Sequence, residues 1–340
     1  MNINDLKAGD ILLFSPEKGS FISWAITYLT DAPVSHAAMF YEEKSQSIIE
    51  ETPPQVAINH AAERFEGREI YVRRLNSKED LPLSPVIEKA QNYLNNAEPY
   101  DHSGLYTVGL LLVYKKFTPN TPVKKAMIKI LKKISSSIIE YIHEHQNPGK
   151  SPMVCSQFVA QCYSDAGDKY KLKINNGVLL KNADRKIVNL NVLDQVMDIV
   201  RNGERKKPQS LLESTIDTQD ELSFSDEELC RELKEAFEST SAEITSDITD
   251  DLVEAVSQFA QANYLYTSGG TLLKSISPDD SSDVLQILKT NENMYVFPGD
   301  LLNHCETLKI LERLSNKGLT DRALRALPGT KSTGERVPNV

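Results

Sequence analysis

Five short runs of strand-forming residues near the amino terminus constrain the fold of this chain more than any other feature. Turn-forming segments separate them, such as Asp31-Ala32-Pro33 and the polar residues 42–46. The runs cover residues 11–14, 35–41, 47–50, 55–58 and 69–73. Connections this short favour antiparallel neighbours, because a parallel pair needs a crossover of about a dozen residues or more. We therefore expect a small antiparallel sheet of four or five strands.

Helical patterns lie between and after these strands. Residues 21–29 carry apolar side chains at mixed helical spacing, and Pro85 fits the first turn of a helix over 86–95. A later helix begins near Pro152 and carries Cys155 and Phe158 on or near one face. Strands and helices together predict an α+β fold.

A basic amphipathic helix is expected over residues 121–146. Its apolar positions repeat at helical spacing from Val123 to Ile142, and five lysines occupy other faces. Such a helix packs on the protein with its lysines in water, or lies on an anionic membrane surface through residues 122–142. Both interpretations stay open from the sequence.

The chain becomes acidic in its second half. Residues 211–256 are rich in Asp and Glu and contain only Arg231 and Lys234 as basic residues. Ser225 and Glu228 have the spacing of a capping box, and a further helix is expected over residues 252–264. This acidic segment is a candidate surface for a basic protein partner, whereas residues 328–340 are polar enough for a loose tail.

Charge and composition exclude several function classes. The 340 residues include 38 Lys plus Arg against 48 Asp plus Glu, a net charge of -10, which argues against a general nucleic-acid-binding protein. The first ten residues have no signal-peptide pattern, and the longest apolar run, residues 108–114, is far shorter than the ~20 residues of a membrane span. A cytoplasmic location is the default, and signal-independent export stays open.

The four cysteines show no CxxC pairing, so we expect neither a zinc site nor a disulfide framework, and no cofactor. Cys155 instead stands near the start of its helix, where the helix dipole favours a thiolate. His36 lies in an otherwise apolar strand, and Glu50 ends the next strand. If these strands pair, Glu50 can orient the ring of His36, and His36 can activate Cys155.

Each of these residues also has a purely structural interpretation. Cys155 fits a small buried side chain, and a histidine in a strand often donates to a backbone carbonyl. Glu51 competes with Glu50 for the orienting role, because a shift of one residue in strand register exchanges the faces of a sheet. His60 is another candidate for that role, and its place just after a strand also fits a solvated loop residue. Asp101 fits a turn better than a catalytic position. The pairs His143/His145 and His304/Cys305 are interpreted as structural.

Several segments, taken in order, resemble YiiX-like proteins of the circularly permuted, NlpC-type papain-like superfamily, in which histidine precedes cysteine. The segments are Gly9-Asp10-Ile11-Leu12-Leu13-Phe14, Val34-Ser35-His36-Ala37-Ala38-Met39-Phe40, Ile48-Ile49-Glu50, Pro99-Tyr100-Asp101 and Val154-Cys155-Ser156-Gln157-Phe158-Val159. The resemblance implies a small antiparallel sheet packed on the cysteine-bearing helix, with added helical elements. It also implies hydrolysis or transfer at an amide or ester carbonyl.

The resemblance also divides the chain. It implies a catalytic core over residues 1–167, interrupted by the basic helix. It further implies that residues 168–293 are an acidic, mostly helical insertion or subdomain. Residues 294–327 are then the closing segment of the core and a helix, because residues 296–301 are similar to the closing segment of relatives.

Three function classes follow. The first is a peptidase or amidase with Cys155 as nucleophile, His36 as base and Glu50 as orienting group, with Ser35 or Gln157 helping to bind the oxyanion. The second is a lipid acyl hydrolase or acyltransferase acting at a membrane surface. The third is an inactive binding module.

Overall fold

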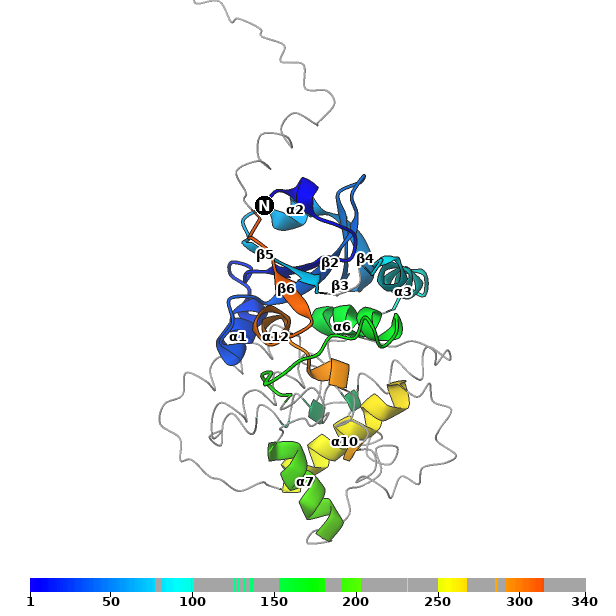
Figure 1. Ribbon diagram of the computed structural model, residues 1–340. Coiled ribbons are helices and arrows are strands. Elements are labelled where there is room, and N and C mark those ends of the chain that lie inside the picture. The colour runs from blue at the N-terminus through cyan, green and yellow to red at the C-terminus, as the bar shows by residue number, and fades with distance from the viewer. Residues whose placement is uncertain are drawn as a thin grey trace, which may run out of the picture.

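The computed structural model has an α+β fold, as the sequence predicts (Figure 1). It describes residues 1–76, 81–98, 100, 153–180, 191–202, 250–267 and 292–314, and the single positions 125, 128, 131, 132, 135, 136, 231, 285 and 286. The strands are β1 (Ile11–Phe14), β2 (His36–Glu42), β3 (Ser47–Thr52), β4 (Gln55–His60), β5 (Ile70–Leu75) and β6 (Leu308–Ile310). The helices are η1 (Ile3–Asp5), α1 (Phe21–Thr30), α2 (Ala61–Phe65), α3 (Ser84–Asn95), α6 (Cys155–Asp165), α7 (Asn191–Asn202), α10 (Asp250–Thr267), η3 (Glu292–Tyr295) and α12 (Pro298–Asn303).

The strands form one antiparallel sheet in the order β4-β3-β2-β1-β5-β6. The register places Phe14 between His36 of β2 and Ile70 of β5. The antiparallel sheet is therefore confirmed, and it has six described strands. The added strand is β6, whose three residues were too short a run to stand out in the sequence.

The two faces of the sheet bury different residues, because side chains alternate along each strand. Leu13, Ala37 and Met39 face α6, whose Phe158 and Val159 pack against them. Leu12, Phe14, Ala38 and Phe40 face the opposite way and pack with Phe65 of α2. In Figure 1, α6 and α12 lie on one side of the sheet and α2 on the other.

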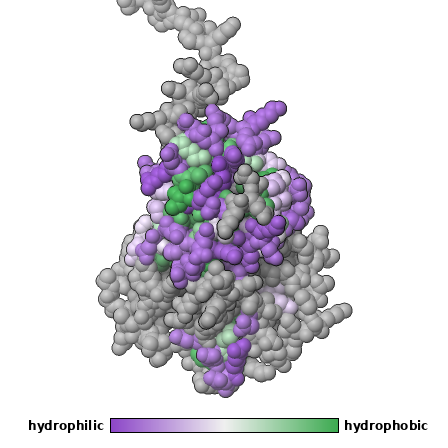
Figure 2. Space-filling model, viewed as in Figure 1, coloured by the Kyte–Doolittle hydropathy of each residue, from purple (hydrophilic) through white to green (hydrophobic). Residues whose placement is uncertain are grey.

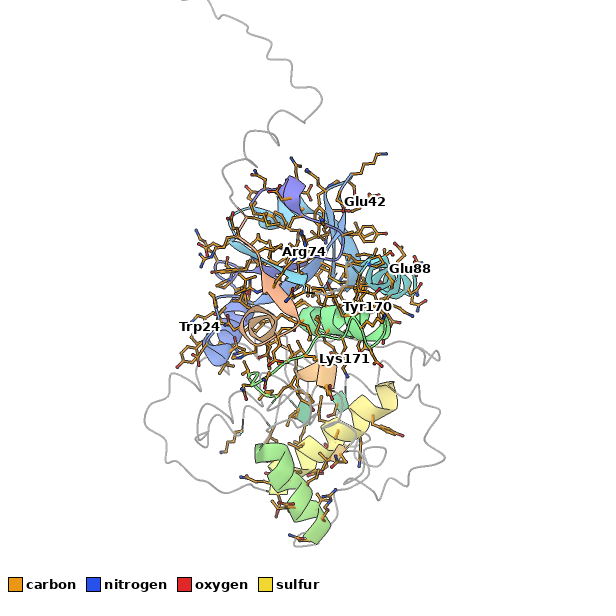
Figure 3. All side chains as sticks on the ribbon, in the orientation of Figure 1. Trp24, Glu42, Arg74, Glu88, Tyr170 and Lys171 are labelled. Carbon is orange, nitrogen blue, oxygen red and sulfur yellow. The ribbon has the colours of Figure 1, made fainter. Side chains whose placement is uncertain are left out.

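One hydrogen bond joins α6 to the sheet, and one ion pair joins two strands of the sheet to each other. The hydroxyl of Tyr163, on α6, donates to the carbonyl of Gly9 at 2.6 Å. The next residue, Asp10, is fully buried and accepts hydrogen bonds from Arg74 at 2.5 and 2.6 Å. Arg74 extends from β5 (Figure 3). A buried carboxylate is stable only when its charge is paired, so this contact fixes β1 against β5.

The last described segment, residues 292–314, packs back onto the sheet that the amino-terminal strands form. β6 pairs with β5 through Arg73 and Ile310, and the hydroxyl of Ser156 donates to the carbonyl of Val296 at 2.7 Å. α12 approaches the turn after α1 closely, since a Cβ on Gly299 would lie 2.6 Å from the Cβ of Ala32. Only glycine permits this approach.

The proposed division at residues 168–293 stays a prediction, because most of that range lies outside the described residues. The same holds for the capping box at Ser225 and most of the basic helix over 121–146. α10 covers the helix expected at residues 252–264 and extends beyond it at both ends. Among the described residues, no helix is both long and apolar enough to cross a membrane.

Figure 2 shows that the visible described surface is largely hydrophilic. The large hydrophobic side chains exposed in the described ranges are Trp24, Tyr28, Ile58 and Ile310.

Candidate active site

Cys155 is the first residue of α6. Val154 precedes it in an extended conformation and accepts the first helical hydrogen bond, from the amide of Phe158 at 2.8 Å. The helix therefore begins at Cys155, near Pro152 as expected. Phe158 and Cys162 anchor α6 in the core, which holds the thiol of Cys155 at the helix amino terminus. Amides of a first turn have no helical acceptor and are available to an anion there.

His36 is the first residue of β2, opposite Phe14. The two rings lie 5.3 Å apart between centroids and are tilted by 59°. The side chain of His36 shares the face of Ala38 and Phe40, and it is 15% exposed. Because it stands at the end of the strand, its ring lies beside Cys155, and the two groups interact.

Glu50 lies on the same face and holds the other side of the ring. Its Oε2 lies 2.5 Å from Nε2 of His36, which leaves Nδ1 for the thiol. Asn59 donates to Oε1 of Glu50 at 2.8 Å, and Nη2 of Arg64 donates to Oε2 at 3.1 Å. Nε of Arg64 is 2.7 Å from Oε1, close enough for an ion pair although its N–H is not aimed at that oxygen. The carboxylate is fully buried yet satisfied.

Glu51 points to the opposite face, as alternation along β3 requires. It belongs with Ile49 on the α6 side, where its charge acts on Cys162. The register between β2 and β3, in which Met39 pairs with Ile49, therefore brings Glu50 and not Glu51 to His36.

Charge pairing sets the ionisation of the three groups. Burial alone would lower the pKa of His36, but attraction by the Cys155 thiolate and hydrogen bonds to Cys155 and Glu50 outweigh it and raise this pKa to about 9. Burial alone would raise the pKa of Glu50, whereas His36 and Arg64 lower it to about 2. At neutral pH the ring is an imidazolium and Glu50 is a carboxylate.

The pKa of Cys155 is also shifted in favour of the charged form of the group. Burial opposes ionisation of Cys155, but the charge and hydrogen bond of His36, with the amides of Ala37 and Ser156, lower its pKa. Burial raises the pKa of Cys162 well above its usual range and that of Cys305 above its own. Of the three cysteines in the described ranges, Cys155 alone has a lowered pKa.

The two candidate oxyanion residues lie in different surroundings. Ser35 is buried beside His36, and its Oγ lies 3.5 Å from Nη2 of Arg68. Gln157 is 7% exposed in the first turn of α6, and its Oε1 has no hydrogen-bond partner in the described chain. Their role in binding an oxyanion stays a prediction.

The remaining candidates lie away from His36 or outside the description. His60 is exposed at the end of β4, opposite Ser47, whereas Glu50 is opposite Ala57. Asp101, His143 and His145 lie outside the described residues. His304 ends α12, and the sulfur of Cys305 contacts the hydroxyl of Thr307 at 3.4 Å. Within the described ranges, no three His, Cys, Asp or Glu side chains gather as metal ligands do.

Sequence reasoning missed four residues around this site, namely Phe14, Asn59, Arg64 and Arg68. The first three contact His36 or Glu50, and Arg68 contacts Ser35, the neighbour of His36. Arg64 and Arg68 follow β4 at a spacing that carries no motif, and only the fold of α2 brings them back over the sheet. No local signal in the sequence identifies them.

Comparison of the chain with protein-family models, curated proteins and solved structures finds no match. The family resemblance of its segments therefore stays a prediction. What the site can do follows from its geometry: a buried thiol beside an imidazole, which a carboxylate orients, at the start of a helix. These are the elements of nucleophilic catalysis at a carbonyl.

The lowered thiol pKa predicts selective alkylation. Near neutral pH, iodoacetamide should modify Cys155 on the order of tenfold or more faster than Cys162 or Cys305, because the thiolate is the reacting species. Peptide mass mapping over time measures the three rates. In the His36→Ala variant, Cys155 should lose this advantage. Equal alkylation rates for all three cysteines in the unmodified protein would contradict the ion pair between Cys155 and His36.

Proposed function

We propose that this protein is a thiol hydrolase that acts on an amide or ester carbonyl through Cys155, His36 and Glu50. The observation that carries the proposal is the continuous contact from Glu50 to His36 to Cys155, with the thiol at the start of α6. An antiparallel sheet packed on a cysteine-bearing helix, with histidine earlier in the chain, also supports the permuted papain-like arrangement that the segments resemble.

In the first step the thiolate of Cys155 attacks the carbonyl carbon, forming a sulfur–carbon bond, and the carbonyl oxygen takes the negative charge. The amide of Cys155, and Ser35 or Gln157, are the candidate donors to that oxygen. His36 then donates its proton to the leaving nitrogen or oxygen, and the bond to that atom breaks. Glu50 keeps the ring oriented throughout.

In the second step neutral His36 takes a proton from water, and the hydroxide formed attacks the acyl-enzyme carbonyl. The acid is released and Cys155 returns as the thiolate beside the imidazolium. Transfer instead of hydrolysis needs only another nucleophile in place of water. We favour a peptidase or amidase, since the imidazolium can protonate a poor nitrogen leaving group.

One observation favours the second candidate, a lipid acyl hydrolase or acyltransferase. Helix α1 carries no charged residue, and Trp24 and Tyr28 on it are 47% and 44% exposed. Their rings stack 5.1 Å apart at an interplanar angle of 9°. Trp24 lies on the outer side of α1 (Figure 3). Exposed Trp and Tyr side chains favour the interface between lipid and water.

Acyl-enzyme formation tests the hydrolase directly. Incubation with p-nitrophenyl acetate should release p-nitrophenolate and leave one acetyl group on Cys155, visible by intact-mass and peptide mass spectrometry. The Glu50→Gln variant should react on the order of a hundredfold more slowly, because a neutral amide holds the imidazolium less well. Cys155→Ala should not be acetylated at this site.

Glu51→Gln is the matched control for Glu50→Gln. Glu51 is equally buried in the same strand but faces away from His36. Its acetylation rate should stay within about twofold of the unmodified sequence. A slow Glu51→Gln protein beside a fast Glu50→Gln protein, with both folded by circular dichroism, would transfer the orienting role. If neither substitution slows acetylation, Glu50 does not orient His36. Absence of acetylation at Cys155 in the unmodified protein would favour the inactive binding module.

Liposome flotation separates the two enzyme classes. If the protein acts on lipids, it should float with anionic vesicles, and Trp24→Ser combined with Tyr28→Ser should reduce the bound fraction several-fold. Ile58→Ser, an exposed hydrophobic side chain on β4, is the matched control and should not. Absence of flotation in the unmodified sequence would remove the lipid candidate and leave the amidase.

A further inference from the structure

Arg68 lies beside the candidate catalytic residues and has no role in the chemistry above. Its Nε and Nη2 donate to the carbonyl of Ser15 at 2.8 and 2.5 Å, and Nη2 reaches Oγ of Ser35 at 3.5 Å. Its guanidinium lies 5.0 Å from the ring centroid of Phe14. These contacts come from the end of β1 and the start of β2, so they hold the charge at the strand ends.

One aromatic ring connects Arg68 to the site. Phe14 is fully buried, and its ring contacts the guanidinium of Arg68 and the imidazole of His36, the latter 5.3 Å away. Arg68 precedes Ile70 by two positions, and Ile70 packs on the same face of the sheet as Phe14. The charge of Arg68 interacts with Cys155 and Glu50, which shows that it lies within electrostatic reach of the thiol.

The charges around the thiol sum to an excess of one positive charge. Arg64, Arg68 and the imidazolium of His36 are cations, whereas Glu50 and the thiolate are anions. Glu17 also acts on Arg68, but from the exposed turn after β1, where water screens its charge. A substrate group with one negative charge is therefore attracted to this side of the site.

We infer that Arg68 is a specificity-determining residue that binds a carboxylate of the acyl substrate, next to the carbonyl that Cys155 attacks. A guanidinium attracts a carboxylate at short range even while its Nε and Nη2 hold the carbonyl of Ser15, and the single excess charge matches a monoanion. The inference rests on the proposed function, since it names the substrate class of that same site: an amide or ester whose acyl part carries a carboxylate.

Two alkylating probes of nearly equal size test this inference. Iodoacetate and iodoacetamide both react by attack of the thiolate on the CH₂ carbon, so that a sulfur–carbon bond forms and iodide leaves. They differ in that iodoacetate carries a carboxylate beside the reacting carbon. The ratio of the iodoacetate rate to the iodoacetamide rate at Cys155 therefore measures attraction of a carboxylate, independently of thiol reactivity. Peptide mass mapping gives both rates.

In the unmodified sequence we expect this ratio to be several-fold higher at Cys155 than at Cys305, and to fall as salt is added. Arg68→Gln should lower the ratio at Cys155 on the order of tenfold, because one nearby charge is lost. Arg68→Lys should retain most of the ratio. Arg313→Gln is the matched control: Arg313 stacks over Tyr71 at 4.4 Å on the opposite face and is 62% exposed, so the ratio should not change.

The two hypotheses fail in different ways. Slow iodoacetamide labelling of Cys155, at the rate of the other cysteines, would contradict the proposed function. Fast iodoacetamide labelling with a ratio that Arg68→Gln leaves unchanged would overturn the role of Arg68 alone. The salt dependence needs no variant, so a ratio that stays constant with salt in the unmodified sequence would overturn the inference even if Arg68→Gln does not fold.

Discussion

The hydrogen bond between Nε2 of His36 and Oε2 of Glu50 is the interaction on which the rest of the site depends. It joins a fully buried carboxylate to an imidazole, and Arg64 and Asn59 satisfy the other contacts of that carboxylate. A buried charge without such partners would be strongly destabilising. Because this bond occupies Nε2, Nδ1 is the ring nitrogen left for the thiol, and charges alternate from Arg64 through Glu50 and His36 to Cys155.

Strand pairing and the position of α6 together bring these alternating charges into contact. Antiparallel pairing of β1, β2 and β3 brings Phe14, His36 and Glu50 to one face near the strand ends, whereas α6 packs on the opposite face. The thiol belongs to the helix and the imidazole to the other side of the sheet, so they meet only where β2 begins. A site at the end of a strand therefore needs both the sheet register and the start of α6 to be correct.

The sequence predicted the strands well because their runs are short, rich in β-formers and separated by turn residues. It also predicted that Cys155, His36 and Glu50 lie together, since a histidine in an apolar strand and a carboxylate ending the next strand form a recognisable pattern, and their catalytic role stays a prediction. It favoured Glu50 over Glu51, but only the register between β2 and β3 shows which of the two faces His36. No signal in the sequence indicated the roles of Arg64 and Arg68, because their approach to the sheet depends on the tertiary path of α2. Strand β6 was too short to detect.

The site works as described only if pairing with Cys155 and Glu50 keeps the ring of His36 protonated at neutral pH. Titration of the His36 ring, followed by NMR, tests it most directly. We predict a midpoint of about 9 in the unmodified protein. In Cys155→Ala the midpoint should be markedly lower, because the strongest group that raises this pKa is gone while burial still lowers it. A midpoint near the ordinary 6.5 in both proteins would contradict the account.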